Sequence, residues 1–383
     1  MTAQTKTIRR IPLTHGDVGT QRSLVVHRYG QEGARPKAYL QAALHADEIP
    51  AMMVQHHLIR MLDAAAEAGQ IKGEIIVVPA ANPIGLGQHL NAVHLGRYEL
   101  GGGGNFNRSW PDLAALVGDK VADALTDDAA GNVDVIRAAM RAAIDGMTPA
   151  DELGSLRRIL AGLACDADFV LDLHCDDEAL MHLYLIPQHW PDAQDLAAEI
   201  GSRATMLAED SGGGSFDEAF STPWVRLARR FEPDRPIPLA CMAATIEYRG
   251  QPEVSDELGR ADAQALFRFL QRRGLVSGNP GPLPASKGEA VDLRAVDVVK
   301  APVSGILAYR AALGATVRKG EVIAEIIDPT AEDVATSRTP VLSGTDGLLF
   351  TRRTHKLVRA GDGVAKVLGR EILAHRTGKL LED

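Results

Sequence analysis

Short apolar runs alternate with longer stretches of helical periodicity over the first 278 residues of the chain. The apolar runs have the length and β-branched content of buried strands, and they occupy residues 36–44, 73–83, 167–174, 181–187 and 238–250. The helical patterns occupy residues 50–68, 132–146, 152–163, 192–207 and 255–274. Strands that alternate with helices predict an α/β fold with a mainly parallel or mixed sheet flanked by helices.

Two of the predicted helices carry recognisable end signals. Pro50 suits the first turn of its helix, and Gly69 suits the C-terminal stop of the same helix. Ser255 is expected to cap the start of the last helix, and Gly274 is expected to follow its end. These signals support the helical interpretation of both segments.

The pattern changes after the last of these helices. Residues 275–290 are rich in Pro, Gly and Ser and are typical of a linker. Beyond them, residues 304–326 and 346–367 repeat one short β pattern, in which a Val is followed three residues later by a Gly. We therefore expect two domains, residues 1–278 and residues 279–383.

The duplicated C-terminal pattern resembles the barrel-sandwich of biotinyl and lipoyl domains. Those carriers place a modified lysine in the hairpin between the two halves. Residues 328–345, which form the equivalent connection, contain no lysine. We therefore expect a small C-terminal all-β barrel-sandwich-like module with a structural or capping role and without a carrier function.

Composition and charge are close to those of an ordinary globular protein. Of the 383 residues, 45% are hydrophobic and 24% are charged, so a core can form without disulfides. The net charge of −9 argues against nucleic acid as the main partner, because phosphate contacts need clustered Lys and Arg. Three widely spaced cysteines are not a disulfide framework, and the sequence shows no secretory signal or membrane span. We expect a cytoplasmic protein that binds neither membrane nor nucleic acid.

Polar residues with the chemistry of a metal site stand where the predicted strands end. The four residues in such positions are His45, Asn82, His174 and Glu247. Sites in α/β sheets lie at the carboxyl ends of strands, so this coincidence supports a shared site. In the segment HADE, His45 and Glu48 are three residues apart, and both side chains can reach one ion. With His174 they form a set of two His and one Glu, which is known for catalytic zinc.

Other residues near these strand ends can take part in binding and catalysis. Asp172 lies two residues before His174, on the same side of the strand, and is either a hydrogen-bond partner of that His or a buried Asp paired elsewhere. Arg108 offers a planar fork for a carboxylate, and Asn107 adds a directional donor. Glu247 would be a sound general base beside a metal ion.

The order of these motifs resembles the succinylglutamate desuccinylase/aspartoacylase family, whose members are relatives of zinc carboxypeptidases. The resemblance rests on HxxE, then Asn-Pro, then Asn-Arg, then DLH, then a strand-end Glu, and it spans nearly the whole chain. The linker and the duplicated C-terminal module are also similar to members of that family. The resemblance implies a zinc-carboxypeptidase-like mixed sheet flanked by helices, and a homo-oligomer such as a dimer would fit the family.

The resemblance implies a ligand set and a carboxylate-binding pair. The implied ligands of one Zn²⁺ ion per chain are His45, Glu48 and His174. The implied binders of a substrate carboxylate are Asn107 and Arg108. These assignments agree with what the residue types indicate by themselves.

The resemblance also implies two catalytic residues. Glu247 would activate water and pass the proton to the leaving amine. Arg97, in the stretch GRYELGGGGNFNR, would polarise the scissile carbonyl and stabilise the oxyanion.

We therefore expect a zinc-dependent deacylase that hydrolyses the amide bond of a small-molecule N-acyl amino acid or a related N-acylated amine. One alternative is a metallocarboxypeptidase that acts on short peptides with the same metal set. A second alternative, from a different class, is a non-catalytic binding protein that uses its C-terminal module for interaction. A lysine-modified carrier is the weakest alternative, because the connecting hairpin lacks a lysine.

Overall fold

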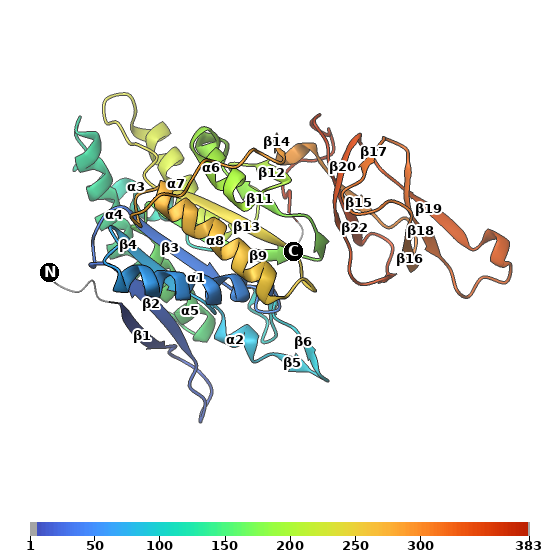
Figure 1. The fold of residues 1–383 in the computed structure, drawn as a ribbon, viewed down its shortest axis with the longest axis horizontal. Helices are drawn as coiled ribbons and strands as arrows, with labels where there is room; N and C mark the ends of the chain where they lie inside the picture. Colours follow the sequence, from blue (N-terminus) through green and yellow to red (C-terminus); the bar gives the residue numbers. More distant parts are fainter. Residues whose placement is uncertain (1–5, 382–383) are drawn as a thin grey trace.

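A computed structural model describes residues 6–381, and these residues fold around one nine-stranded sheet with a smaller β module beside it (Figure 1). In spatial order, the strands of the large sheet are β1 (Thr7–Pro12), β2 (Ser23–Tyr29), β4 (Glu74–Val78), β3 (Lys37–Ala42), β9 (Phe169–Asp176), β13 (Met242–Gly250), β11 (His182–Leu185), β12 (Ala204–Leu207) and β14 (Glu289–Asp292). The four central strands, β4, β3, β9 and β13, are parallel, whereas β2 and β11 run antiparallel to the central strands beside them. The predicted α/β fold with a mixed sheet is confirmed.

Helices cover both faces of this sheet (Figure 1). One face carries α1 (Pro50–Glu67), α6 (Trp190–Ile200) and α8 (Asp256–Arg272). The other face carries α3 (Leu113–Val121), α4 (Ala129–Asp145), α5 (Glu152–Ala164) and α7 (Phe216–Phe231). Each face has its own hydrophobic core, the first under α1, α6 and α8 and the second under α3, α4, α5 and α7. Successive side chains of a strand point to opposite faces, so Ala38 and Leu40 pack in the first core and Tyr39 packs in the second.

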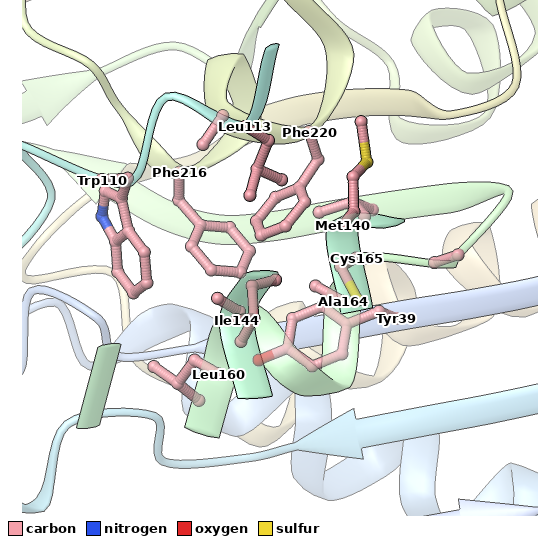
Figure 2. Close-up of a cluster of buried hydrophobic side chains, with 14 of the residues drawn as sticks. Tyr39, Trp110, Leu113, Met140, Ile144, Leu160, Ala164, Cys165, Phe216 and Phe220 are labelled. Atoms are coloured by element: carbon pink, nitrogen blue, oxygen red, sulfur yellow. The ribbon is translucent and has the colours of Figure 1, made fainter. Parts of the chain in front are cut away.

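Aromatic rings make up much of the second core, as Figure 2 shows. The ring of Phe216 lies 4.6 Å from that of Trp110 and 5.8 Å from that of Tyr39, measured between centroids. Trp110 follows Arg108 of the Asn-Arg motif by two residues, and Phe216 directly follows a glycine-rich segment, SGGGS, at residues 211–215. Burial of these rings therefore anchors two loops that reach the carboxyl edge of the sheet.

The predicted helix ends agree with the structure. Pro50 is the first residue of α1, and Gly69 follows it with a φ of +70°. The Ser255 hydroxyl oxygen accepts a hydrogen bond from the Leu258 N–H at 3.2 Å and caps α8. Gly274, with a φ of +75°, follows the end of that helix.

The helix predicted at residues 192–207 is wrong in its second half. The helix α6 ends at Ile200, because Gly201 takes a left-handed conformation with a φ of +69°. Residues 204–207 instead form β12, which pairs in parallel with β11. The helices α3 and α7, which follow the two loops described above, were not predicted from the sequence.

The glycine-rich stretch between β4 and α3 contains short ordered elements. These are α2 (Pro83–Leu86), β5 (His89–Leu90), β6 (Val93–His94), β7 (Tyr98–Glu99) and β8 (Gly104–Asn105). The strands β5 and β6 form one hairpin, and β7 and β8 form a second hairpin. Residues 100–103, which include three of the four consecutive glycines, close the second hairpin, and the fourth, Gly104, begins β8. This pairing places Asn105 opposite Tyr98.

The C-terminal module consists of small antiparallel sheets, coloured orange to red in Figure 1. Its strands are β15 (Val296–Lys300), β16 (Gly305–Tyr309), β17 (Thr316–Val317), β18 (Val322–Ile327), β19 (Arg338–Leu342), β20 (Gly347–Arg352), β21 (Leu357–Val358) and β22 (Gly363–Leu368). The predicted duplication is present: β16, β17 and β18 repeat as β20, β21 and β22 in the same order along the chain. Gly320 and Gly361, the equivalent turn residues, have φ angles of +81° and +88°.

The two parts of the chain share strands. The strand β14, which lies beyond residue 278, pairs in parallel with β12 of the large sheet. The two-residue strand β10 (Glu178–Ala179), from the first part, pairs with β20 of the module. The division into residues 1–278 and 279–383 stays a prediction. None of the helices within residues 6–381 is long and apolar enough to cross a membrane.

Candidate metal and active site

Three predicted residues converge at the carboxyl edge of the sheet. Nδ1 of His45 lies 2.9 Å from Oε1 of Glu48, and Nδ1 of His174 lies 2.7 Å from the other carboxylate oxygen. Candidate ligand atoms of these three buried residues all lie within 4.8 Å of one another. No other group of three or more His, Cys, Asp or Glu side chains within residues 6–381 has this arrangement.

The outer nitrogens of both imidazoles are held by acceptors. Nε2 of His45 lies 2.8 Å from the side-chain oxygen of Asn105, which also accepts a hydrogen bond from the Asn107 N–H at 2.9 Å. Nε2 of His174 lies 2.8 Å from Oδ2 of Asp172. Of the two predictions made for Asp172, the structure therefore agrees with a contact to His174. Each acceptor favours a hydrogen on Nε2 and leaves the Nδ1 lone pair facing Glu48.

This donor set fits a metal ion. Two imidazole lone pairs and a carboxylate that face one another need a proton or a cation between them. Nitrogen and oxygen donors of this kind, with hydrogen-bonded outer nitrogens, are typical of zinc ligands. The three residues that the sequence assigned to the metal therefore stand together with the orientation that the assignment requires.

The electrostatics of the cluster also favour a cation. Burial lowers the pKa of His45 to about 4, and the nearby charge of Arg97 adds to this effect. Burial alone would raise the pKa of Glu48, but His45 and His174 lower it below the usual range. Burial opposes a charge on His174, yet Asp172 and Glu48 outweigh burial and raise its pKa. In the absence of a metal, a proton on His174 would satisfy part of this demand.

Adjacent strands bring the site residues together. In the register of the sheet, Glu247 of β13 stands directly opposite His174 of β9. His45 follows β3, the other neighbour of β9, by three residues. These three strands run parallel, so their carboxyl ends lie at one edge.

The loop that carries HADE is held by buried contacts. Asn82, which is fully buried, donates from Nδ2 to the Leu44 carbonyl at 2.8 Å and accepts from the Gly85 N–H at 2.8 Å. The Ala46 N–H donates to the Gly96 carbonyl at 2.9 Å. Asn82 therefore supports the loop and caps α2, and it does not contact the metal ligands through these bonds.

Arg97 reaches the ligand cluster because its neighbour lacks a side chain. A Cβ on Gly96 would lie 2.1 Å from the backbone nitrogen of Asp47, so only glycine allows this close approach. One guanidinium nitrogen of Arg97 then lies 3.3 Å from Oε1 of Glu48 and 3.3 Å from Nδ1 of His45. The structure therefore places Arg97 beside the ligands, where a cationic donor can reach a carbonyl oxygen.

Asn107 and Arg108 also lie at this edge. The Asn107 amide nitrogen is 3.3 Å from Nε2 of His174 and 3.5 Å from Oδ2 of Asp172, and the amide oxygen accepts from the Phe216 N–H at 2.8 Å. The guanidinium of Arg108 donates to the Asn107 carbonyl at 2.7 Å. Asn107 is thus tied to the scaffold of the site, and Arg108 extends from it towards the cavity.

Glu247 carries an unengaged carboxylate oxygen in the cavity wall. Among the described residues, no hydrogen-bond partner is found for its buried Oε2. Burial, and then the negative charge of Glu48, raises the pKa of this carboxyl to about 8. A cation bound to the neighbouring ligands would lower this pKa, because a positive charge stabilises the ionised carboxylate. Glu247 could then accept a proton from water near neutral pH.

All seven candidate residues line one cavity of about 730 Å³. They are His45, Glu48, Arg97, Asn107, Arg108, His174 and Glu247. A further part of the wall comes from the C-terminal module and includes Arg353, His355 and Lys366. The Lys366 ammonium donates to Oδ2 of Asp176 at 2.5 Å and joins the module to β9, two residues beyond His174.

Sequence reasoning missed Asn105 and the wall from the module. Asn105 lies two residues before Asn107 in the same motif, and an amide near a ligand His is the signal that could have pointed to it. Nothing local in the sequence indicates that Lys366 meets Asp176, because 190 residues separate them. The sequence predicted a structural or capping role for the module. It did not predict that side chains of the module, such as Arg353 and Lys366, would line the cavity.

Comparison with known proteins points to one family. The family model for the succinylglutamate desuccinylase/aspartoacylase catalytic domain matches residues 34–136. That segment contains HADE, Arg97 and the Asn-Arg motif. Over 373 residues the chain is 26% identical to the N-alpha-acetyl-L-2,4-diaminobutyric acid deacetylase of Halomonas elongata, with 94% of this chain and 89% of that protein covered.

Solved structures share the fold. A succinylglutamate desuccinylase/aspartoacylase family protein of Shewanella amazonensis superposes with a TM-score of 0.81 at 23% identity, covering 94% of this chain and 98% of that one. A succinylglutamate desuccinylase/aspartoacylase protein of Shewanella frigidimarina superposes with a TM-score of 0.82 at 22% identity, covering 96% and 98%. Both likenesses include the C-terminal module as well as the large sheet, as the coverage shows.

Proposed function

We propose that the chain, which resembles the succinylglutamate desuccinylase/aspartoacylase family in sequence and fold, is a zinc-dependent deacylase of that family. Its substrate is an N-acyl amino acid or a related N-acylated amine, whose amide bond it hydrolyses. The observation that carries this proposal is the convergence of two imidazole Nδ1 atoms on the Glu48 carboxylate inside a cavity. The deacetylase activity named for the Halomonas relative supports the reaction class.

We assign zinc binding to His45, Glu48 and His174. When bound, zinc would lower the pKa of a water molecule and polarise a carbonyl group. Asn105 and Asp172 would keep the two imidazoles in the tautomer and orientation that this role needs, because the side-chain oxygen of each lies 2.8 Å from an Nε2 atom and can accept its hydrogen.

Proton transfer falls to Glu247 in this proposal. Its carboxylate would take a proton from the attacking water and hand it to the nitrogen of the leaving amine. Arg97 would donate to the carbonyl oxygen as negative charge develops there. A donor of this kind is usually worth about 3–4 kcal/mol of transition-state stabilisation. The position of Arg97 beside Glu48 and His45 supports this role.

Substrate orientation falls to the Asn-Arg motif. The guanidinium of Arg108 would bind a substrate carboxylate through two parallel hydrogen bonds. The side-chain oxygen of Asn107 already accepts a hydrogen bond from the Phe216 N–H, and one amide hydrogen points towards Asp172. The other amide hydrogen would donate to the substrate carboxylate. Such anchoring would hold the amide bond over the ligand cluster and reduce the entropic cost of reaction.

The test is amine release from a panel of N-acetyl, N-succinyl and N-formyl amino acids, diamino acids and short peptides. We expect release from at least one N-acyl amino acid, loss of release with a chelator, and its return with zinc. Preferential release of amino acids from peptides would favour the carboxypeptidase alternative. A protein without bound metal and without turnover would contradict the proposal.

A variant of one ligand tests the metal set itself. His174→Ala should abolish stoichiometric zinc binding and turnover, because it removes one of three protein ligands. His57→Ala is a suitable control, since His57 contacts Asp256 and lies outside the ligand cluster. Full zinc occupancy in His174→Ala would show that the proposed ligand set is wrong.

A further inference from the structure

The C-terminal segment of the described chain returns to the catalytic sheet. The Leu380 N–H donates to the Ser211 carbonyl at 2.8 Å, and the Arg376 guanidinium donates to the Leu380 carbonyl at 2.6 Å. Leu380 is only 7% exposed and, like Arg376, it lines the cavity that holds the site. A side chain this close to the end of the described residues is thus fixed by contacts on both its peptide groups.

Leu380 fills the seam between the two parts of the protein. It packs in a hydrophobic cluster that contains Met206 of the large sheet. The same cluster contains Val296 and Phe350 of the C-terminal module. Leu380 therefore belongs to a cluster that draws apolar groups from both parts, and its burial helps to hold the segment against the cavity wall.

A glycine loop connects this segment to Arg108. A Cβ on Gly212 would lie 2.8 Å from Cα of Lys379, and a Cβ on Gly213 would lie 2.6 Å from Cδ of Arg108. The loop is also bonded to the Asn-Arg motif, because the Ser109 N–H donates to the Gly213 carbonyl at 3.1 Å. Backbone contacts thus run without a gap from Leu380 through the loop to Arg108.

We propose that Leu380 is a specificity-determining residue that limits the size of the group accepted in the cavity. The segment that carries it forms a fixed part of the cavity wall and supports the loop behind Arg108. This inference rests on the proposed deacylase function. It deepens that function by predicting that this part of the wall makes the protein hydrolyse compact N-acyl amino acids faster than bulkier ones.

The experiment compares hydrolysis of a small and a bulky N-acyl amino acid by the zinc-loaded full chain. In Leu380→Ala, the ratio of kcat/KM for the bulky substrate to that for the small one should rise by at least about tenfold, the lower end of the effect of one methylene group in an apolar pocket. The matched control is Ile372→Ala, which removes a 54% exposed side chain from the same terminal segment. We expect the control to keep the wild-type ratio.

A second variant and a second measurement guard against misfolding. Leu380→Met roughly conserves volume and should keep the ratio within about twofold. Amide hydrogen exchange should become faster at residues 211–215 in Leu380→Ala and stay unchanged in Ile372→Ala. An unchanged ratio in a folded, zinc-loaded Leu380→Ala protein would overturn the proposal, as would an equal rise in Ile372→Ala.

Failure of the underlying function has a different signature. If wild-type protein hydrolyses no member of the panel, the deacylase proposal fails whatever the variants do, and the size-selection proposal fails with it. If wild-type protein is active but the substrate ratio does not respond to Leu380, only the size-selection proposal fails. Unchanged hydrogen exchange at residues 211–215 would overturn the support that we assign to the segment.

Discussion

The two walls of the cavity are built in different ways. The wall with the ligands comes from the carboxyl ends of β3, β9 and β13, and each of its residues stands in a short motif beside a strand. Another part of the wall comes from β20, β22 and the segment around Leu380, whose residues meet the rest of the site through contacts between distant segments, such as Lys366 with Asp176, 190 residues apart. The reactive side chains are thus positioned by short motifs at strand ends. The remaining wall, which sets the size and shape of the cavity, is positioned by packing between distant segments.

The sharpest way to test this comparison is to remove the proposed base. Glu247→Gln should lower kcat by about 10²–10⁴-fold, because the amide cannot accept a proton at neutral pH. Zinc content should stay near one per chain, since Glu247 is not among the three candidate ligands. Single-turnover kinetics with metal analysis would separate the two effects, and a near-normal rate would show that another group is the base.

A smaller effect is expected at the partner of a ligand. Asn105→Ala should weaken zinc binding by about 10–100-fold, because it removes the acceptor that orients His45. Asn105→Asp keeps an acceptor oxygen at this position and should keep most of the affinity. Competition with a chromogenic chelator would measure both values, and equal affinities for Ala and wild-type proteins would exclude an orienting role.

The contact between the two walls has its own test. Lys366→Met should lower the free energy of unfolding by about 1–3 kcal/mol, because it leaves the Asp176 carboxylate partly buried without its cation. Asp176→Asn in the same protein should recover part of this loss. A double-mutant cycle in denaturant would give the coupling energy, and purely additive effects would mean that the ion pair does not link the walls.

The smallest effect is expected on the outer surface of the module. Arg310 donates to Glu325 at an exposed position, and exposed ion pairs contribute little to stability. Arg310→Ala should therefore leave both the midpoint of unfolding in denaturant and kcat/KM close to their wild-type values. A large loss of activity in this variant would show that the module acts on the site by a route other than the cavity wall.

The sequence contained most of the ligand wall because its signals are local. A histidine at a strand end, an acid three residues away and a second strand-end histidine define a metal set once the strands are recognised. The β module was also visible, because an internal repeat can be found without knowing any contact. The family resemblance added Arg97, whose position depends on the close approach of Gly96 to the HADE loop.

The rest depended on packing that no local pattern records. Residues 204–207 are apolar in a way that suits either a helix or a buried strand, and their pairing with β11 decided between these. The meeting of Lys366 with Asp176 and of Leu380 with Ser211 joins segments far apart in the chain. Such contacts depend on how the two parts are arranged in space, and this arrangement cannot be derived from local patterns in a single sequence.

The placement of β14 has a consequence for anyone who wishes to study the first part alone. This strand follows the linker in the sequence, yet it covers the edge of β12 with parallel pairing. A fragment that stops at residue 278 would leave β12 with unpaired backbone groups along a buried, apolar strand. Open edges of this kind invite pairing between chains, so that fragment should aggregate. A fragment that continues through residues 289–292 would keep β12 paired on both sides.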